Sequence, residues 1–185
     1  MAKSLFLAIL ILVTPVVPAQ ILSAYITYSP IHPSNVQTGV VNNQLQYTSY
    51  WASGVGGGVT FNFLPLHIIN LGLDLRGSTA PGTPGADTAL VGIKLSVHPP
   101  LLRLRPYIQG SGGYLGTRST NVTPGAAAGT TVSHNNAAWE ILGGIDYPLM
   151  HFLDFRAIEI GGGKAIGSSS NPSLFTINTG LVVHF

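Results

Sequence analysis

The residues of this chain whose types and spacing could do chemistry are few, and the most suggestive are a serine and a histidine. Ser133 and His134 are adjacent, and Glu140 follows six positions later. A serine nucleophile needs a histidine base within hydrogen-bonding distance and an acid that orients the histidine, so these residues raise the hypothesis of a hydrolase. Adjacent residues of a strand point to opposite faces, however, so an extended stretch here would separate Ser133 from His134. We therefore predict no catalytic residues.

Four histidines raise the possibility of a metal site, because imidazole is a common ligand. His67, His98 and His151 accompany tight Pro-containing or apolar turns, and His184 lies near the end of the chain. The segments that carry them are not all expected to be neighbours, so packing at a membrane interface is the preferred interpretation. The glycine run 55–59 lacks the Lys-Ser/Thr and the helix of a phosphate loop. No metal and no cofactor are predicted.

Composition restricts the class of protein that could position these residues. Only 8% of the 185 residues are charged and mean hydropathy is +0.38, whereas roughly a quarter of an ordinary soluble domain is charged. No basic cluster supports nucleic-acid binding, and the absence of cysteine excludes disulfides and thiolate metal sites. Beyond the N-terminus no stretch is apolar for the ~18 residues of a membrane helix. A membrane β-barrel and a glycine-rich soluble β-sandwich remain.

Residues 1–19 have the features of a secretory signal peptide. Lys3 provides the positive charge, an apolar core of nine residues (LFLAILILV) follows, and Val17-Pro18-Ala19 predicts cleavage after Ala19. The sequence therefore predicts two parts: a signal peptide, 1–19, and one β-barrel domain, 20–185.

Apolar residues alternate with polar ones along most of that domain, which is the pattern of β-strands. The clearest case is the C-terminal segment, where Phe175, Ile177, Leu181, Val183 and Phe185 share one parity. The pattern predicts eight strands near 21–29, 45–63, 67–78, 88–97, 102–117, 137–147, 152–163 and 173–185. Short connections near 64–66, 98–101 and 148–151 alternate with long ones near 30–44, 79–87, 118–136 and 164–172, as in outer-membrane barrels.

Charged residues provide a second test of this arrangement. Nearly all charged residues within the predicted strands occupy the positions that alternate with the apolar residues. Glu159 is the exception, and a β-bulge near Ala157–Ile158 would place it on the same face as the others. In a barrel this face is the lumen, and five acids would there meet five bases. The predicted lumen network consists of Asp74, Arg76, Lys94, Arg103, Arg105, Glu140, Asp146, Asp154, Arg156 and Glu159.

Aromatic residues near the predicted strand ends indicate two membrane interfaces. Phe63, Tyr147, Phe152 and Phe185 would lie at the periplasmic side, and Tyr28, Tyr114 and Trp139 at the opposite side. Scattered core aromatics are the alternative.

The terminal run 175–185 (FTINTGLVVHF) resembles the C-terminal strand by which the barrel assembly machinery recognises outer-membrane proteins. With the leader and eight strands, the chain resembles the small eight-stranded family related to the transmembrane domain of outer membrane protein A and to the opacity-type porin-like proteins. The resemblance implies an all-β, antiparallel, up-and-down transmembrane barrel in the bacterial outer membrane, surrounded by its lipids and lipopolysaccharide.

Three functions follow from this resemblance and from the charges. The first is a structural or surface-interaction scaffold with exposed loops and a charge-paired, largely closed lumen. The second is a narrow diffusion pore. The third is a lipid A-modifying hydrolase, since some barrels of this size deacylate lipopolysaccharide, although Ser133 and His134 do not match the His-any-Ser pattern of those enzymes. The scaffold, which is not an enzyme, is the preferred prediction.

Overall fold

The computed structural model describes residues 21–65, 68–100, 102–127, 129–167 and 171–185, and these residues form β-strands without helices. The predicted signal peptide lies outside the described residues. The strands are β1 (Leu22–Tyr28), β2 (Ile31–Ser34), β3 (Val36–Val41), β4 (Gln44–Thr48), β5 (Val55–Pro65), β6 (Ile69–Ala80), β7 (Gly85–Val97), β8 (Arg105–Thr120), β9 (Thr131–Met150), β10 (Leu153–Ile166) and β11 (Ser173–His184). No helix among these residues is long and apolar enough to cross a membrane.

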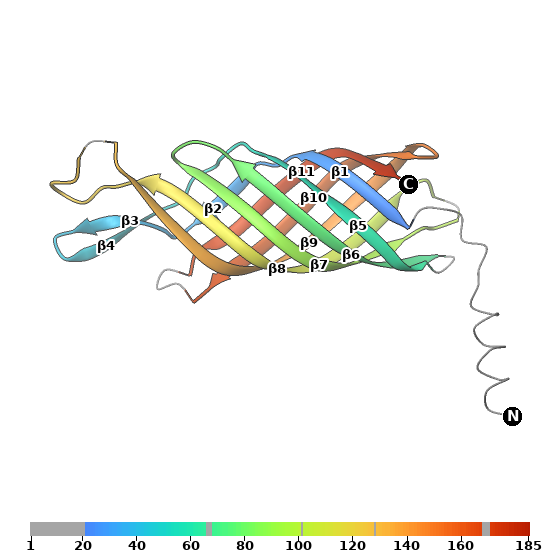
Figure 1. Cartoon of the computed structure of the whole chain (residues 1–185), viewed down its shortest axis with the longest axis horizontal. Helices are drawn as coiled ribbons and strands as arrows, with labels where there is room; N and C mark the ends of the chain where they lie inside the picture. Colours follow the sequence, from blue (N-terminus) through green and yellow to red (C-terminus); the bar gives the residue numbers. More distant parts are fainter. Residues whose placement is uncertain (1–20, 66–67, 101, 128, 168–170) are drawn as a thin grey trace, which may run out of the picture.

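Eight of these strands close into a ring. Each pairs antiparallel with its neighbour in the order β1-β5-β6-β7-β8-β9-β10-β11, and β11 pairs back with β1. Closure removes the free edges that an open sheet would expose. Figure 1 shows the strands tilted about the long axis of this ring. The fold is therefore an eight-stranded, antiparallel, up-and-down barrel, as the sequence predicted.

The first long connection differs from the prediction, because it is largely β-structure. β2 continues the line of β1 and pairs with the outer half of β11, while β3 and β4 form a separate hairpin. The predicted strand 45–63 was therefore wrong in its first half: residues 44–48 belong to the hairpin, and the barrel strand begins at Val55. Alternation of apolar residues is the same in a hairpin arm and in a barrel strand, so the pattern alone could not separate them.

The hairpin turn is made by Asn42 and Asn43, which both have positive φ (49° and 62°). Asparagine tolerates this region, and two such residues form the turn whose twist matches a two-residue hairpin. Figure 1 shows the hairpin beyond one end of the barrel, opposite the end at which the chain terminates. We call this end, with the 81–84 and 121–130 connections, the outer end.

Other boundaries also shift. β7, β8, β9 and β10 extend further toward the outer end than predicted. The connection at 81–84 is therefore tight, and Asp87, Arg118 and Lys164 lie in strands rather than loops. At the other end β8 begins only at Arg105, so residues 102–104 belong to the turn. The predicted bulge is present: the register of β10 against β11 shifts between Arg156 and Glu159.

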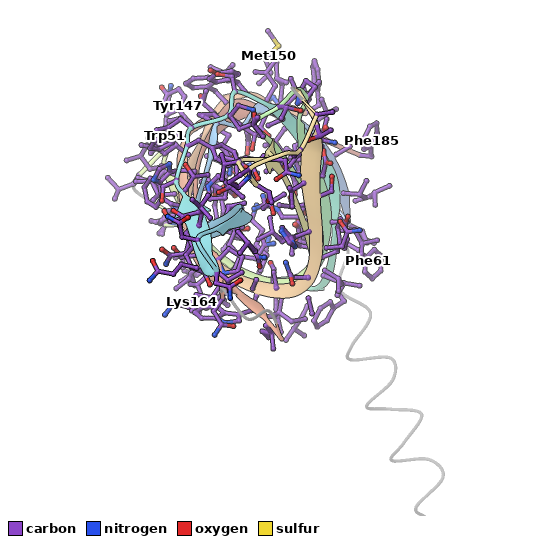
Figure 2. All side chains as sticks on the ribbon, turned by 90° about the vertical axis from the view of Figure 1, so that its left-hand side faces the viewer. Trp51, Phe61, Tyr147, Met150, Lys164 and Phe185 are labelled. Atoms are coloured by element: carbon purple, nitrogen blue, oxygen red, sulfur yellow. The ribbon has the colours of Figure 1, made fainter. Side chains whose placement is uncertain are left out.

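The outward wall is apolar. Large hydrophobic side chains remain exposed around the ring, including Ile26 at 64%, Leu75 at 54% and Ile141 at 53%. Figure 2 shows side chains such as Phe61 and Phe185 pointing away from the ring. An apolar surface this extensive is unusual on a soluble protein and is the surface that a barrel presents to lipid.

The inward wall is polar near the middle and apolar toward the outer end. The apolar layer is a set of buried residues from seven strands and the chain segment before β5: Ile31, Ala52, Ala80, Ala86, Leu115, Ala138, Ala165 and Leu174. Ile31 and Leu115 are completely buried. Because β2 carries Ile31 into contact with this layer, the chain between β1 and β5 helps to fill the outer end of the barrel.

Candidate functional site: a charge network inside the barrel

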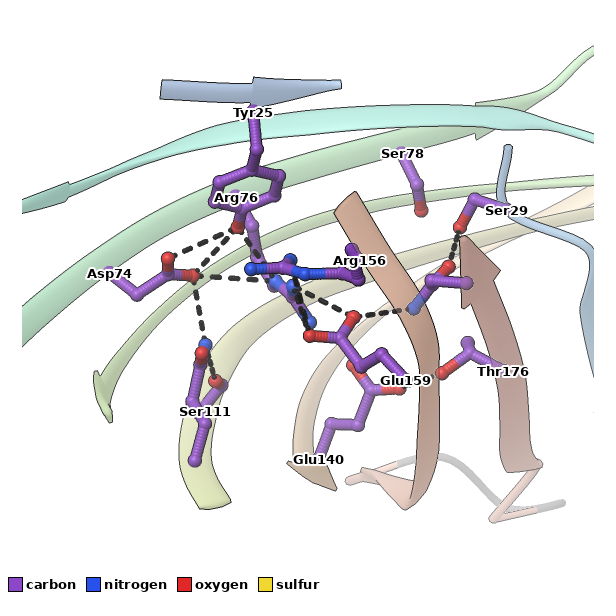
Figure 3. A network of polar contacts seen from close by, with 12 residues as sticks. Tyr25, Ser29, Asp74, Arg76, Ser78, Ser111, Glu140, Arg156, Glu159 and Thr176 are labelled. Atoms are coloured by element: carbon purple, nitrogen blue, oxygen red, sulfur yellow. Dashed lines mark hydrogen bonds and ion pairs between the residues drawn. The ribbon is translucent and has the colours of Figure 1, made fainter. Parts of the chain in front are cut away.

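The center of the barrel is organised around the Glu159 carboxylate, which is completely buried. Arg76 donates to it from β6 at 2.9 and 3.0 Å, and Arg156 donates from β10 at 3.3 Å. The Tyr107 hydroxyl donates from β8 at 2.6 Å and the Asn178 amide from β11 at 2.7 Å. Figure 3 shows the Arg76 and Arg156 side chains meeting the Glu159 carboxylate. The bulge in β10 is what turns Glu159 inward.

Asp74 forms a second center on β6, which lies across the ring from β10. Its carboxylate accepts hydrogen bonds from Tyr25 (2.9 and 3.1 Å), Thr60 (2.7 Å) and Gln109 (2.9 Å). Arg76 lies 3.4 Å away and also donates to the Tyr25 hydroxyl at 3.2 Å. Arg76 therefore links the two carboxylate centers into one network.

Arg156 lies between two tyrosine rings and an aspartate. Its guanidinium carbon is 4.4 Å from the Tyr25 ring centroid and 5.0 Å from that of Tyr107, and its Nε donates to Asp146 at 3.0 Å. Lys94 approaches the same Asp146 carboxylate at 3.5 Å and the Tyr107 ring at 3.9 Å. The rings supply their negative faces to cations that have little access to water, which offsets part of the cost of burial.

Both tyrosine rings depend on a glycine in the neighbouring strand. Tyr25 is paired with Gly58 and Tyr107 with Gly144. A Cβ atom at either glycine would lie within 3 Å of the ring. The glycines thus leave the space in which each ring covers the opposite backbone and reaches the center of the barrel.

A smaller cluster lies toward the inner end, away from the hairpin. Arg105 donates to Asp154 at 2.7 Å, and the His184 ring bridges Asp154 at 2.9 Å and Ser23 at 2.8 Å. Since these residues stand on β1, β8, β10 and β11, the cluster spans the seam at which the first and last strands meet. His98, in the turn beside it, has its pKa lowered by burial and by the neighbouring Arg105.

One interior acid forms no direct ion pair with another described residue. The buried Glu140 carboxylate accepts a hydrogen bond from Thr176 at 2.6 Å. Arg103, which was predicted to lie in the lumen, is exposed in the turn before β8. That prediction was wrong because Leu102 and Leu104 alternate with polar residues as in a strand, although β8 begins only at Arg105. Five acids thus face four lysine and arginine side chains.

The predicted interface aromatics lie on the outer surface. Phe63, Phe152 and Phe185 are exposed at the inner end and Tyr147 is half-buried there, while Tyr28, Tyr114 and Trp139 are exposed on the other side. Tyr28 donates to Ser53 at 3.1 Å and Tyr114 to Asn135 at 2.7 Å. An apolar ring with a hydrogen-bonded polar tip is the arrangement found at a membrane interface.

The hypothetical serine–histidine pair is not assembled. In β9, Ser133 is exposed on the outer face, whereas His134 and Glu140 belong to the inner face. Among the described residues no group of three His, Asp or Glu side chains is arranged for a metal ion; His67 lies outside that part of the chain.

Several interior residues were not part of the predicted network, namely Tyr25, Thr60, Tyr107, Gln109, Asn178 and His184. Tyr25 has the opposite parity to the apolar Ala24 and Ile26, and Tyr107 and Gln109 have the parity of Arg105. Parity could therefore have placed these residues inside. It could not have shown which of them meet across the barrel.

Tyr50 connects the hairpin to the barrel rim. Its hydroxyl donates to the backbone carbonyls of Gly85 at 2.7 Å and Arg118 at 2.9 Å. Burial raises the pKa of Tyr50 to about 12. Since the folded state favours the neutral phenol, stability should decline as pH rises from the ordinary tyrosine value of about 10 toward 12.

The absorbance of tyrosine can be titrated with pH in the folded protein and in the variant Tyr50→Phe. We expect the difference between the two titration curves to show one phenol that ionises near pH 12. The variant should also lose less stability than the parent between about pH 10 and 12. A difference curve centered near the ordinary value, or equal alkaline sensitivity of both proteins, would contradict the role given to this contact.

The closed ring, the apolar outer wall and the polar, ion-paired interior define a small eight-stranded transmembrane β-barrel of the outer-membrane type. No family model matches the chain and no curated protein matches its sequence. Solved structures match its fold. The N-terminal barrel domain of Pseudomonas aeruginosa OprF has 12% identity and a TM-score of 0.48 over 86% of this chain and 96% of that one.

Two further barrels are similar to the same extent. Neisserial surface protein A has 14% identity and a TM-score of 0.47, covering 88% of this chain and 97% of that one. Ail, the attachment invasion locus protein of Yersinia pestis, has 8% identity and a TM-score of 0.48, covering 88% and 98%. At these identities the likeness concerns the fold alone.

Proposed function

We propose that the chain is a bacterial outer-membrane scaffold with a closed interior, which presents the β3–β4 hairpin and the tips of its strands at the cell surface. The observation that carries the proposal is the filled lumen. The buried network of Glu159, Asp74 and their donors crosses the barrel from wall to wall. The cavities beside it measure only about 20 and 50 Å³, enough for a few water molecules.

The outer end is closed a second time. The apolar layer around Ile31 and Leu115 lies above the network, and the hairpin reaches across to β8 and the connection after it. The Val122 amide donates to the Thr38 carbonyl at 3.1 Å, and the Val40 amide donates to the Thr123 hydroxyl at 3.1 Å. An ion would have to break buried ion pairs and enter an apolar layer, which disfavours the alternative of a narrow diffusion pore.

Lipid contact and assembly belong to the same proposal. The exposed apolar belt would contact outer-membrane lipids, with lipopolysaccharide at the outer interface. Residues 175–185 would provide the strand that the barrel assembly machinery recognises, and this strand closes the ring on β1. In this proposal the functional part of the protein is its outer end, not its lumen.

Planar-bilayer recording tests the closed lumen. Protein that shifts in electrophoretic mobility on boiling, the mark of a folded barrel, should be reconstituted from an outer-membrane fraction. We expect no single-channel steps across the physiological range of voltage, with protease protection of the strands showing that the protein has inserted. Reproducible unitary steps from the inserted protein would overturn the closed-lumen proposal in favour of the pore.

A further inference from the structure

The β3–β4 hairpin has one strand edge to which no other described strand is paired. β4 pairs with β3 on one side, and these two strands form a sheet of their own. The turn fixes which backbone groups are free: Val41 and Gln44 adjoin the two-residue turn and exchange hydrogen bonds, so the groups of Leu45 and Tyr47 point away from β3. The Thr38 hydroxyl donates to the Gln46 carbonyl at 3.2 Å, which agrees with this alternation.

The free edge carries none of the features that usually prevent strand addition. Proteins protect such edges with charged side chains, prolines or a covering element. Between Lys3 and Asp74 the sequence has no acidic residue, lysine or arginine, and the segment 36–48 has no proline. Leu45 and Tyr47 are 43% and 45% exposed. Two identical hairpins would therefore meet without charge repulsion.

The edge is complementary to itself. If two copies of β4 pair antiparallel about Gln46, Leu45 of each copy lies opposite Tyr47 of the other. The free N–H and C=O groups of these residues then face one another and can form four hydrogen bonds. The same register makes two aliphatic–aromatic cross-strand pairs, which stabilise antiparallel sheets. One two-fold axis generates the whole contact, so the assembly closes at two copies.

We propose that β4 is a self-association edge that joins two copies of this chain in facing membranes. Figure 1 shows the hairpin projecting beyond the barrel along its long axis. A two-fold axis that relates antiparallel strands is perpendicular to them, so it places the two barrels at opposite ends of the paired hairpins. The inference rests on the proposed function in one respect: the hairpin end must face outward from the cell. One such contact is small, and many copies on each surface would supply the strength.

Disulfide trapping tests both the register and the geometry, because the chain has no cysteine. Residue 46 lies on the two-fold axis as a non-hydrogen-bonded pair, where opposing Cα atoms approach to about 4.5 Å, within disulfide range. Gln46→Cys should therefore cross-link. Leu45→Cys, the matched control, faces the other copy's Tyr47 rather than itself and should cross-link at least tenfold less.

The experiment uses shed outer-membrane vesicles, in which the protein keeps its cellular orientation. One population carries ¹⁵N-labelled protein and the other unlabelled protein, and mild oxidation of the mixture is followed by mass spectrometry of the linked peptides. We expect mixed ¹⁴N–¹⁵N dimers of Gln46→Cys to form about half of the product. Dimers of one isotope only would show contact within a single membrane and overturn the proposal. Equal linkage at 45 and 46, or none at either, would do so as well.

A second measurement does not depend on a thiol. Tyr47→Pro removes an edge N–H that β3 does not use and should reduce vesicle aggregation, measured by light scattering, to the level of vesicles without the protein. Ala127→Pro, in the neighbouring 121–130 connection, should leave aggregation unchanged. Boiling-dependent mobility shows that each variant is folded. Aggregation that survives Tyr47→Pro would contradict the inference while leaving the closed-lumen proposal to the bilayer recordings.

Discussion

Replacing Glu159 with alanine should lower the free energy of unfolding by about 3–5 kcal/mol, the cost of leaving a buried charge without its partner. Arg76 and Arg156 would both lose the carboxylate that they now contact at 2.9 and 3.3 Å. Urea unfolding in lipid vesicles, followed by the fluorescence of Trp51 and Trp139, measures the change. Glu159→Gln should fall between the parent and the alanine variant, because it keeps a hydrogen-bond acceptor without the charge.

The matched control for this prediction is an ion pair on the outer wall. Arg118 and Asp87 lie 2.9 Å apart but remain about one third exposed, and exposed pairs contribute about 0–1 kcal/mol. Asp87→Ala should therefore have a small effect. Similar losses for Glu159→Ala and Asp87→Ala would show that water reaches the interior network, and the closed lumen would then lose its main support.

Gly144→Val should destabilise the barrel by about 2.5–6 kcal/mol. A Cβ at this position would lie 2.5 Å from the Tyr107 ring, so the ring must leave its place over the β9 backbone. Overpacking costs roughly 1–3 kcal/mol, and loss of the hydrogen bond from Tyr107 to the Glu159 carboxylate costs roughly 1.5–3 kcal/mol. The fraction of folded, boiling-sensitive protein and the urea midpoint report the effect.

Gly162→Val controls for the change of residue type. Gly162 also lies in a barrel strand, but a Cβ there meets nothing within 4 Å, so this variant should be nearly neutral. Tyr107→Ala should remove most of the additional cost of Gly144→Val in the double variant, because the ring that causes the clash is absent. Additive effects of the two substitutions would contradict the glycine–tyrosine arrangement.

Alternation of side chains was sufficient to predict the ring of strands and most of the charged residues in its interior. In a paired strand, odd and even positions point to opposite faces of the sheet, so Asp74, Arg76 and Arg156 could be placed inside the barrel. The β-bulge before Glu159 could be predicted as well, because Glu159 alone broke the alternation of its strand. The alternation of apolar and polar residues was misleading where it continued outside the barrel strands. Leu45 and Tyr47 alternate in the hairpin, and Leu102 and Leu104 alternate in a turn, which misplaced Arg103.

Contacts across the barrel could not be predicted in the same way. Arg76 and Glu159 are 83 residues apart and stand on strands that are not neighbours. Their meeting depends on tilt, stagger and the space left by Gly58 and Gly144, which one strand's pattern does not contain. The small polar donors around Glu159, such as Asn178, give no signal of their own, because an amide on an inward face is common in any polar lumen.

The gathering of donors around Glu159 also has a consequence for the order in which the barrel assembles. Its partner Arg76 comes from β6, across the ring from β10, so an unclosed sheet would hold the Glu159 charge without this cation. Entry of such a sheet into the membrane is correspondingly unfavourable. Insertion and ring closure should thus occur as one cooperative event, with no long-lived half-inserted form.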